Sequence, residues 1–360
     1  MKDVITIIGP NSRHASGGMA SVTKGLLASP ILNEHYILTE YPSCKDGSLI
    51  TRLTYSAVQF LKFLFSKKSA TLYHIHLASY SSTWRKFLYF KIIKKTKARC
   101  VLHVHGGEYA KFLEALPNKK QDAIKRLFKE ADVVVVLAEL WKKYFTTVFN
   151  LDNVVVVNNG IDSELYNYKS GDGVLMAFVG NLSPEKGVDD LLAALSIVAE
   201  GNKNFCCYFV GGGDIPRVKG IAGNLGILDN VVFTGLLSEQ EVAELLRITA
   251  IMVLPSYHEG FPMSILEAMS AGNAIVSTSV GGIPEIVSEN GGILVEPGDV
   301  DALANAVRCL LCSCEQTKQM GVINSKRVNS HYDIEIMHKE LLGVYDNVVH
   351  AGKKQYESSY

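Results

Sequence analysis

The sequence predicts an α/β protein built from two Rossmann-like, doubly wound domains. Three observations carry this prediction. A chain of 360 residues is too long for one ordinary core. Both halves alternate short apolar runs of strand type with longer segments of helix type, which is typical of a parallel sheet covered by helices. With 48% apolar and 20% charged residues, each half can bury a core, and extended disorder is excluded.

In the first half, the apolar runs predict strands near 3–8, 35–39, 71–77, 99–105, 132–137 and 153–157. The segments between them predict helices near 18–28, 50–66, 82–96, 119–130 and 139–149. The second half repeats the alternation, with strands near 174–180, 205–211, 230–233, 250–254, 274–278 and 291–295. Its helices are predicted near 187–200, 215–225, 238–248, 262–271, 300–313 and 333–349.

The polar stretch 158–173 contains Asn158-Asn159-Gly160 and Ser170-Gly171-Asp172-Gly173, so we place the hinge between the domains there. The predicted domains are residues 1–165 and 166–332, and a helix in 333–360 is expected to cross back to the first domain. Open α/β sheets bind ligands at the carboxyl ends of their strands, so we expect the chemistry in a central cleft that the two domains face.

The net charge of zero hides an asymmetry between the halves. Residues 1–165 carry 23 Lys and Arg against 13 Asp and Glu, a net of +10. Residues 166–360 carry 13 against 23, a net of −10. A basic half should attract anionic partners such as phospholipid surfaces or diphosphate-linked substrates.

Two basic and aromatic segments in the first half sharpen this expectation. They run from Arg52 to Lys68 and from Arg85 to Arg99, and both combine apolar residues with lysines. Such helices suit an anionic bilayer surface. The alternative is that each apolar face packs on its own sheet and that the lysines are merely solvated.

The seven cysteines form no metal-binding pattern. We interpret Cys309, Cys312 and Cys314 as buried thiols rather than metal ligands, because no fourth ligand stands near them. The apolar run at the start is too short for a signal peptide, and no stretch has the ~20 apolar residues of a spanning helix. We therefore expect a cytoplasmic protein that is peripheral on the inner face of the plasma membrane where its basic half docks.

The most informative stretch runs from His258 to Gly272 and follows the predicted strand 250–254. Pro262 suits the first turn of a helix and Gly272 its end. A helix that opens directly after a strand presents free backbone N–H groups and a positive dipole end, which together bind anions. Glu267 lies inside this helix and Glu259 in the loop before it, so both carboxylates are placed to accept hydroxyl hydrogen bonds.

In this context the sequence resembles the donor motif of family 4 glycosyltransferases, which have the two-domain GT-B fold. Further segments match that family in order: Gly17-Gly18-Met19, His105-Gly106-Gly107-Glu108, Asn158 to Asp162, Phe178 to Gly187, and Gly281 to Glu285. The resemblance covers residues 9 to 300 and is far more specific than any single motif.

The resemblance implies roles for individual residues. Glu267 would bind the ribose of a nucleotide-diphosphate sugar and Glu259 the transferred sugar. The backbone of Gly260, Phe261, Pro262, Met263 and Ser264 would face the phosphates. Lys186 would neutralise the leaving diphosphate, and His105 would lie at the reacting side of the sugar. Gly17 and Gly18 would allow the backbone to approach diphosphate and acceptor closely.

One position departs from the family pattern, which usually has Arg where this chain has Asn181. Asn carries no charge, so phosphate stabilisation would depend more on Lys186 and on backbone dipoles. Arg217 or Arg13 would be the nearest candidates to compensate.

We therefore expect a retaining, metal-independent hexosyltransferase that uses no cofactor beyond its nucleotide sugar, with UDP-sugar favoured. The acceptor would be a lipid-linked or oligosaccharide intermediate of O-antigen (lipopolysaccharide) or capsule polysaccharide biosynthesis, and no nucleic acid is expected as a partner. Two alternatives stay open: a GT-B transferase acting on a soluble small acceptor, and a non-catalytic nucleotide-sugar sensor.

Overall fold

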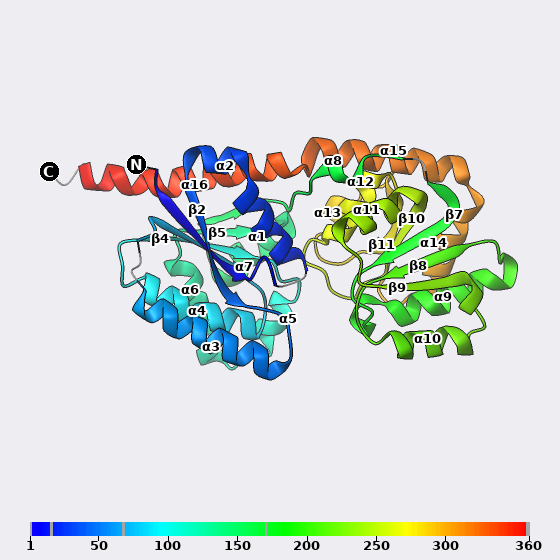
Figure 1. Cartoon of the computed structure of the whole chain (residues 1–360), viewed down its shortest axis with the longest axis horizontal. Helices are drawn as coiled ribbons and strands as arrows, with labels where there is room; N and C mark the ends of the chain where they lie inside the picture. The colour runs from blue at the N-terminus through cyan, green and yellow to red at the C-terminus, as the bar shows by residue number, and fades with distance from the viewer. Residues whose placement is uncertain (1, 15–16, 67–68, 170, 358–360) are drawn as a thin grey trace. The chain divides into compact units, whose positions relative to one another are not determined.

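The computed structural model of the chain describes residues 2–14, 17–66, 69–169 and 171–357. These residues form two compact units (Figure 1). Unit 1 consists of residues 1–159 together with 334–360, and unit 2 consists of residues 160–333.

Unit 1 contains a six-stranded parallel sheet with the order β2-β1-β3-β4-β5-β6. Its strands are β1 (Val4–Pro10), β2 (Ile37–Cys44), β3 (Leu72–Leu77), β4 (Arg99–Val104), β5 (Val133–Val136) and β6 (Val154–Val156). Its helices are α1 (Gly18–Ala28), α2 (Pro30–His35), α3 (Leu49–Phe65), α4 (Ser81–Ile93), α5 (Tyr109–Glu114), α6 (Asn118–Glu130), α7 (Glu139–Phe149) and α16 (Ile334–Glu357). The strand order reverses between β1 and β3, and such a switch point is where open α/β sheets bind ligands.

The last helix, α16, completes the core of unit 1. Its residues Met337, Leu341 and Tyr345 are buried against Ile5 and Leu72 of the sheet. Figure 1 shows this helix, in red, beside α2 of the same unit. The fold of unit 1 therefore uses two stretches of chain that are far apart in the sequence.

Unit 2 contains a second six-stranded parallel sheet, with the order β12-β11-β10-β7-β8-β9. Its strands are β7 (Asp172–Val179), β8 (Cys206–Val210), β9 (Val231–Gly235), β10 (Thr249–Leu254), β11 (Ala274–Thr278) and β12 (Gly292–Val295). Its helices are α8 (Ser163–Tyr166), α9 (Val188–Gly201), α10 (Ile215–Asn224), α11 (Glu239–Ile248), α12 (Met263–Ala271), α13 (Ile283–Ile286), α14 (Val300–Cys312) and α15 (Cys314–His331), with 3₁₀ turns η1 (Pro184–Lys186) and η2 (Leu228–Asn230). The order reverses between β7 and β10, so the segments after these two strands meet at the switch point.

The predicted fold class is confirmed, and every predicted strand is present in its half of the chain. The strands form because short β-branched and apolar runs are buried on both faces. Thr249–Leu254, for example, is buried at every position, as a parallel sheet covered on both sides requires. One long helix, α15, was not predicted, because its buried face is made of small and polar residues such as Thr317, Gly321 and Asn324.

One interpretation of an individual segment needs correction. Cys309, Cys312 and Cys314 are exposed free thiols rather than buried ones. Cys309 and Cys312 lie on the solvent side of α14, whose buried face consists of Leu303, Ala306, Val307 and other apolar residues.

Among the described helices, none is both long and apolar enough to span a membrane.

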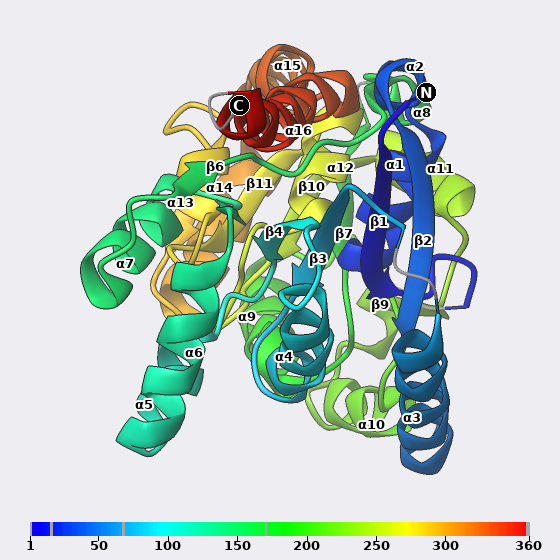
Figure 2. The same ribbon diagram turned by 90° about the vertical axis from the view of Figure 1, so that its left-hand side faces the viewer.

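The two basic and aromatic segments differ in how their apolar residues are used. Helix α4 buries Tyr89, Phe90 and Ile93, so the apolar face of the segment from Arg85 packs on its own sheet. Helix α3, by contrast, lies along the edge of unit 1 beside β2 (Figure 2). Within Leu49–Phe65, all of which the structure describes, only Phe63 is fully buried. Lys67 and Lys68 lie outside the described residues.

Candidate active site

The loop between β10 and α12 in unit 2 has the predicted strand–loop–helix form. Leu254 ends the strand, Pro262 is the N-cap of α12, and Gly272 ends the helix with a left-handed φ of 90°. The N-cap makes no side-chain hydrogen bond to the first turn. The helix therefore offers backbone N–H groups and its positive dipole end at the carboxyl edge of the sheet.

Glu259 and Lys186, which are 73 positions apart, form an ion pair in this loop region. Lys186 Nζ lies 2.6 Å from Glu259 Oε1, and Ser256 Oγ donates a second hydrogen bond to the same oxygen at 2.7 Å. Glu259 is 9% exposed, whereas the side chain of Lys186 is 30% exposed. The carboxylate is thus held from inside, while the ammonium group reaches toward solvent.

Two glycines allow the chain to approach this pair closely. Gly187 has a φ of +67°, and a Cβ there would lie 2.0 Å from the carbonyl oxygen of Pro255. Gly281 has a φ of +55°, and a Cβ there would lie 1.9 Å from the carbonyl oxygen of Glu259. Both positions therefore demand glycine on conformational and steric grounds. A hydrogen bond of 3.0 Å from the backbone N–H of Tyr257 to the carbonyl oxygen of Glu185 joins the loop after β10 to the segment after β7.

Glu267 sits partly buried on α12, as the sequence predicts for a helix that opens at Pro262. Burial raises the pKa of Glu267 to about 7, and repulsion from the Glu239 carboxylate adds to the rise. A hydrogen bond with Tyr166 lowers the pKa and partly offsets these effects. The carboxyl group therefore titrates near neutral pH, where small changes in its surroundings change its charge.

The remaining residues of the predicted set in unit 2 have different environments. Asn181 is exposed in the loop after β7. Phe261 is buried and packs edge-on against Tyr332, with ring centroids 5.7 Å apart, so its side chain is a packing residue. Arg217 donates through Nη1 to both carboxylate oxygens of Asp189, at 2.8 and 2.9 Å. Its charge is thus already partly neutralised, and it is a weak substitute for the missing arginine.

The predicted residues of unit 1 lie near its switch point. Gly17 is the N-cap of α1 with a φ of +95°, and both it and Gly18 are exposed. His105 follows β4 and is half-buried; its backbone N–H donates to Leu77 O at 2.8 Å. Burial lowers the pKa of His105 to about 3, helped by His74 and Lys86, so the imidazole is neutral near pH 7.

Sequence reasoning missed several residues that shape these surroundings. In unit 2 they are Ser256 and Tyr166, which bond the two glutamates. In unit 1 they are His76 and His103, which pack against His105, and His74, which packs against His103. The paired His-x-His spacing at 74–76 and 103–105 was the available signal, since residues two apart in a strand face the same side.

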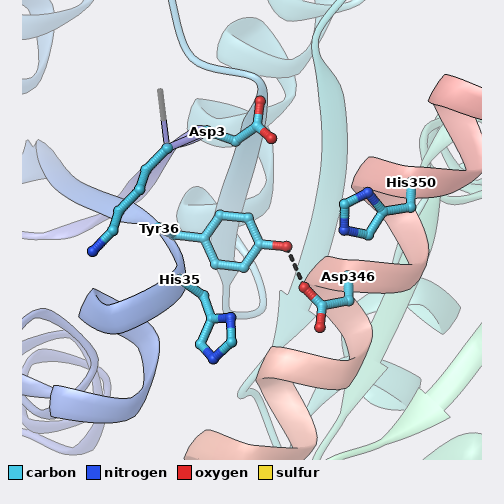
Figure 3. Close-up of a pocket in the computed structure, with 6 residues that line it drawn as sticks. Asp3, His35, Tyr36, Asp346 and His350 are labelled. Atoms are coloured by element: carbon cyan, nitrogen blue, oxygen red, sulfur yellow. Dashed lines mark hydrogen bonds between the residues drawn. The ribbon is translucent and has the colours of Figure 1, made fainter.

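A pocket of about 550 Å³ in unit 1 contains none of the predicted residues. Its lining is Lys2, Asp3, His35, Tyr36, Asp346 and His350, drawn in Figure 3. Tyr36 Oη donates to Asp346 Oδ1 at 2.5 Å and joins the start of β2 to α16. This pocket lies at the amino ends of β1 and β2, the edge opposite to His105, so we interpret it as a groove beside α16.

Family comparisons match both halves of the chain. Residues 167–327 match the family "Glycosyl transferases group 1", and residues 35–165 match "Glycosyltransferase Family 4". An amylovoran biosynthesis glycosyltransferase of Erwinia amylovora is 25% identical over 359 residues, covering 87% of this chain and 86% of the relative. An uncharacterized glycosyltransferase of Methanocaldococcus jannaschii is 30% identical over 236 residues, covering 60% of each chain. The chain thus spans about three fifths of the length of several curated relatives that it matches.

Solved structures match nearly the full length of the chain and establish the GT-B fold. Sucrose-phosphate synthase from Thermosynechococcus elongatus has a TM-score of 0.80 at 19% identity, covering 97% of this chain and 100% of the other. Anabaena HepE in complex with UDP-glucose has a TM-score of 0.77 at 17% identity, covering 96% and 99%. At these identities the likeness concerns the fold alone.

Proposed function

The chain belongs to the family 4 glycosyltransferases, and from this premise we propose that it is a retaining enzyme that uses a nucleotide-diphosphate sugar. The observation that carries the proposal is the ion pair of Lys186 and Glu259. Glu259 lies three residues before Pro262, the N-cap of α12. A mobile cation, a fixed carboxylate and a helix N-terminus together suit a diphosphate joined to a sugar.

The hydrogen-bonding capacity of the pair supports separate roles. An ammonium group has three donors, and one of those on Lys186 is directed to Glu259 Oε1. The other donors are proposed to bind the diphosphate, together with backbone N–H groups at the start of α12. The hydrogen bonds from Lys186 and Ser256 both go to Oε1 of Glu259, and we assign Oε2 to a hydroxyl of the transferred sugar. Glu267 is assigned to the ribose.

In the proposed front-face reaction, the bond between the anomeric carbon and the donor phosphate oxygen breaks. The bond to the acceptor oxygen forms on the same face, and the acceptor proton passes to the departing phosphate. Lys186 and the α12 dipole stabilise the charge that develops on the leaving group. No metal ion is needed in this scheme. From unit 1 we assign His105, a neutral imidazole, to the sugar side and Gly17 and Gly18 to the acceptor side.

UDP is the favoured nucleotide, because Anabaena HepE of the same fold was solved with UDP and with UDP-glucose. A hexosyl or N-acetylhexosaminyl unit is the proposed cargo. The amylovoran enzyme, with its coverage of 86%, supports a place in polysaccharide biosynthesis. The proposed acceptor is a lipid-linked or oligosaccharide intermediate of O-antigen (lipopolysaccharide) or capsule type.

Helix α3 supports an acceptor carried at a membrane surface. Ile50, Leu53, Leu61 and Leu64 are 74%, 62%, 54% and 40% exposed and recur at helical spacing along one face, ending at Phe65 with 88%. The charged residues of this helix are Arg52 and Lys62, both basic, so an anionic bilayer complements it in charge and polarity. We therefore propose that α3 docks on the inner face of the plasma membrane of a cytoplasmic, peripheral enzyme.

The test is a thermal-shift panel of UDP-, GDP- and ADP-sugars, followed by a transfer assay with product stereochemistry read by NMR. A UDP-sugar is expected to raise the Tm by mass action, and the product should keep the donor's anomeric configuration. Glu267→Ala should abolish both effects, while Glu244→Ala, an exposed glutamate of α11, should not. An inverted product would overturn the retaining mechanism. Complete loss of turnover in chelator, restored by Mn²⁺, would overturn metal independence.

The same panel separates the alternatives. A non-catalytic sensor, which the uncharged Asn181 favours, would show the thermal shift without hydrolysis or transfer. A transferase for soluble acceptors would turn over small sugars without lipid, and the exposed apolar face of α3 weighs against it.

A further inference from the structure

Three buried histidines of unit 1 gather on one face of its sheet. His74 and His76 lie two positions apart on β3, and His103 on β4 is the register partner of His76. All three are 0% exposed. One ring nitrogen of each lies within 4.8 Å of those of the other two. The sheet thus presents three imidazoles at a spacing close to that of ligands around one metal ion.

The hydrogen bonds within the group resemble a metal site with a proton in place of the ion. His74 Nε2 and His103 Nδ1 lie 3.0 Å apart and share one proton. Two nitrogens bound tetrahedrally to zinc at ordinary bond lengths are about 3.3 Å apart, so the replacement requires little movement. Nε2 of His76 has no partner among the described residues, although it is buried. Buried polar atoms are normally bonded, so this arrangement leaves capacity for a ligand.

We propose that His74, His76 and His103 form a binding site for one transition-metal ion of the zinc, cobalt or nickel class. The ion takes the place of the proton between His74 and His103, with Nε2 of His76 as the third ligand.

The charge state of the group suits this ligand class. Burial lowers the pKa of His74 to about 3 and that of His76 and His103 well below the ordinary value, so the rings are neutral near pH 7. Neutral imidazole is the form that binds metals. Because the group consists of imidazoles alone, it favours zinc, cobalt or nickel over magnesium or calcium, which prefer oxygen ligands.

The surroundings supply the outer contacts that metal-bound histidines usually make. His74 Nδ1 bonds the hydroxyl of Tyr345 at 2.5 Å, and His76 Nδ1 bonds His105 Nε2 at 2.6 Å. Such contacts orient ligating rings and fix their tautomers. His105, which bonds His76, is half-buried at the carboxyl end of β4, so the group is connected to a partly exposed side chain. The ion would join β3 and β4 and, through Tyr345, α16, and would thereby stabilise unit 1.

The test uses the full chain, freed of metal by chelator and dialysis. Titration with Co²⁺ should give the visible absorption of a four-coordinate complex, and calorimetry should show one Zn²⁺ per chain. His103→Gln should weaken Zn²⁺ binding by at least about 100-fold, and Tyr345→Phe by about 10- to 100-fold. His35→Gln, an exposed histidine of α2, is the matched control and should change nothing.

X-ray absorption on the zinc-loaded wild type should show at least three imidazole ligands, so the proposal does not depend on a foldable variant. Zn²⁺ should also raise the Tm of the wild type and of Glu267→Ala alike, which separates this site from the proposed donor site. Absence of Co²⁺ absorption together with absence of Zn²⁺ heat would overturn the proposal. So would binding that His103→Gln and His76→Gln leave unchanged.

Discussion

Lys186 Nζ and Glu259 Oε1 lie 2.6 Å apart, so the two residues assigned to opposite ends of the donor's reacting bond also hold each other in place. Their relationship follows from topology, since the segments after β7 and β10 meet where the strand order of unit 2 reverses. The carboxylate is the more buried partner and depends on the ammonium group for charge compensation.

Removing the ammonium group tests this dependence. Lys186→Ala is expected to lower kcat/KM by about 10²- to 10³-fold, because stabilisation of the leaving diphosphate is lost. The same change should also reduce the free energy of unfolding by about 1–3 kcal/mol, since the buried Glu259 is left uncompensated. In Lys186→Ala/Glu259→Gln the stability loss should be largely recovered and the activity loss should not. Additive stability losses in denaturant titrations would contradict the coupling.

The raised pKa of Glu267 predicts a pH dependence of donor binding. Below pH about 7 the carboxyl is mostly protonated, and above it the carboxylate can accept both ribose hydroxyls. Donor affinity should therefore rise as the pH increases toward 7 and level off above it. At pH values up to about 7, where the free carboxyl still carries its proton, binding should release that proton. Calorimetry in buffers of different ionisation enthalpy measures that release, and Glu267→Gln should abolish it.

The free energy of unfolding should depend on pH in the opposite direction to donor affinity. A pKa raised from 4.5 to about 7 means that the folded chain keeps a proton that the unfolded chain has already lost. The contribution of Glu267 to the free energy of unfolding should thus fall as the pH rises from 4.5 to about 7. The difference in the free energy of unfolding between the wild type and Glu267→Gln, measured as a function of pH, isolates the contribution of Glu267. A difference independent of pH would show that the carboxyl has an ordinary pKa.

Gly281 has no room for a side chain. Gly281→Ala would place a Cβ 1.9 Å from the Glu259 carbonyl at a positive φ, so the loop before α12 must shift. We expect a lower Tm. We also expect donor affinity, read from the donor-induced thermal shift, to fall by about 10-fold or more, because contacts aligned by that loop are lost. Gly201→Ala in the same unit meets nothing within 4 Å and should be neutral or slightly stabilising. Equal behaviour of the two variants would show that the loop tolerates the shift.

Asn181 marks the place where a positive charge is absent. Because it is exposed, Asn181→Arg can be introduced without repacking. A charge-assisted hydrogen bond to phosphate should strengthen UDP binding by about 5- to 50-fold. Asn181→Gln is the control of similar polarity without charge. If calorimetry gives the same Kd for both variants, the side chain does not face the diphosphate.

The exposed face of α3 predicts binding to anionic vesicles. Leu53→Glu and Leu61→Glu should each weaken sedimentation with anionic vesicles by about 10-fold or more, because a buried leucine contributes roughly 1.5–3 kcal/mol. Leu236→Glu changes an even more exposed leucine, which lies in unit 2, and should have no effect. If the wild-type protein binds neither anionic nor neutral vesicles, the proposed membrane docking is wrong, and the proposed transfer reaction is not affected.

The alternation of apolar and amphipathic segments was enough to predict both sheets, because parallel strands such as Thr249–Leu254 are buried at every position. The start of α12 was predictable for a similar reason, since Pro262 and Gly272 mark helix ends by their backbone preferences. Helix α15 could not be predicted, because its Gly321 and Asn324 pack against neighbouring backbone and give no periodic apolar pattern.

The candidate site was predictable only in part. The sequence indicated Glu259 and Lys186 separately, but their contact depends on the order of strands across the sheet. Ser256 and Tyr166 escaped notice because a hydroxyl beside a carboxylate leaves no mark in sequence spacing. The cysteines of α14 and α15 were misplaced because thiols are usually buried, whereas here they occupy solvent-facing positions of helices.

The helix α16 has a consequence for biosynthesis. Residues 1–159 leave the ribosome long before Leu341 and Tyr345, which fill the core of the same unit. Domains generally fold as units during synthesis, so residues 160–333 can mature while the earlier stretch still lacks part of its interior. The Tyr345 hydroxyl that bonds His74 is translated only after all of unit 2. In this protein the second unit of the chain is therefore the first that can finish folding.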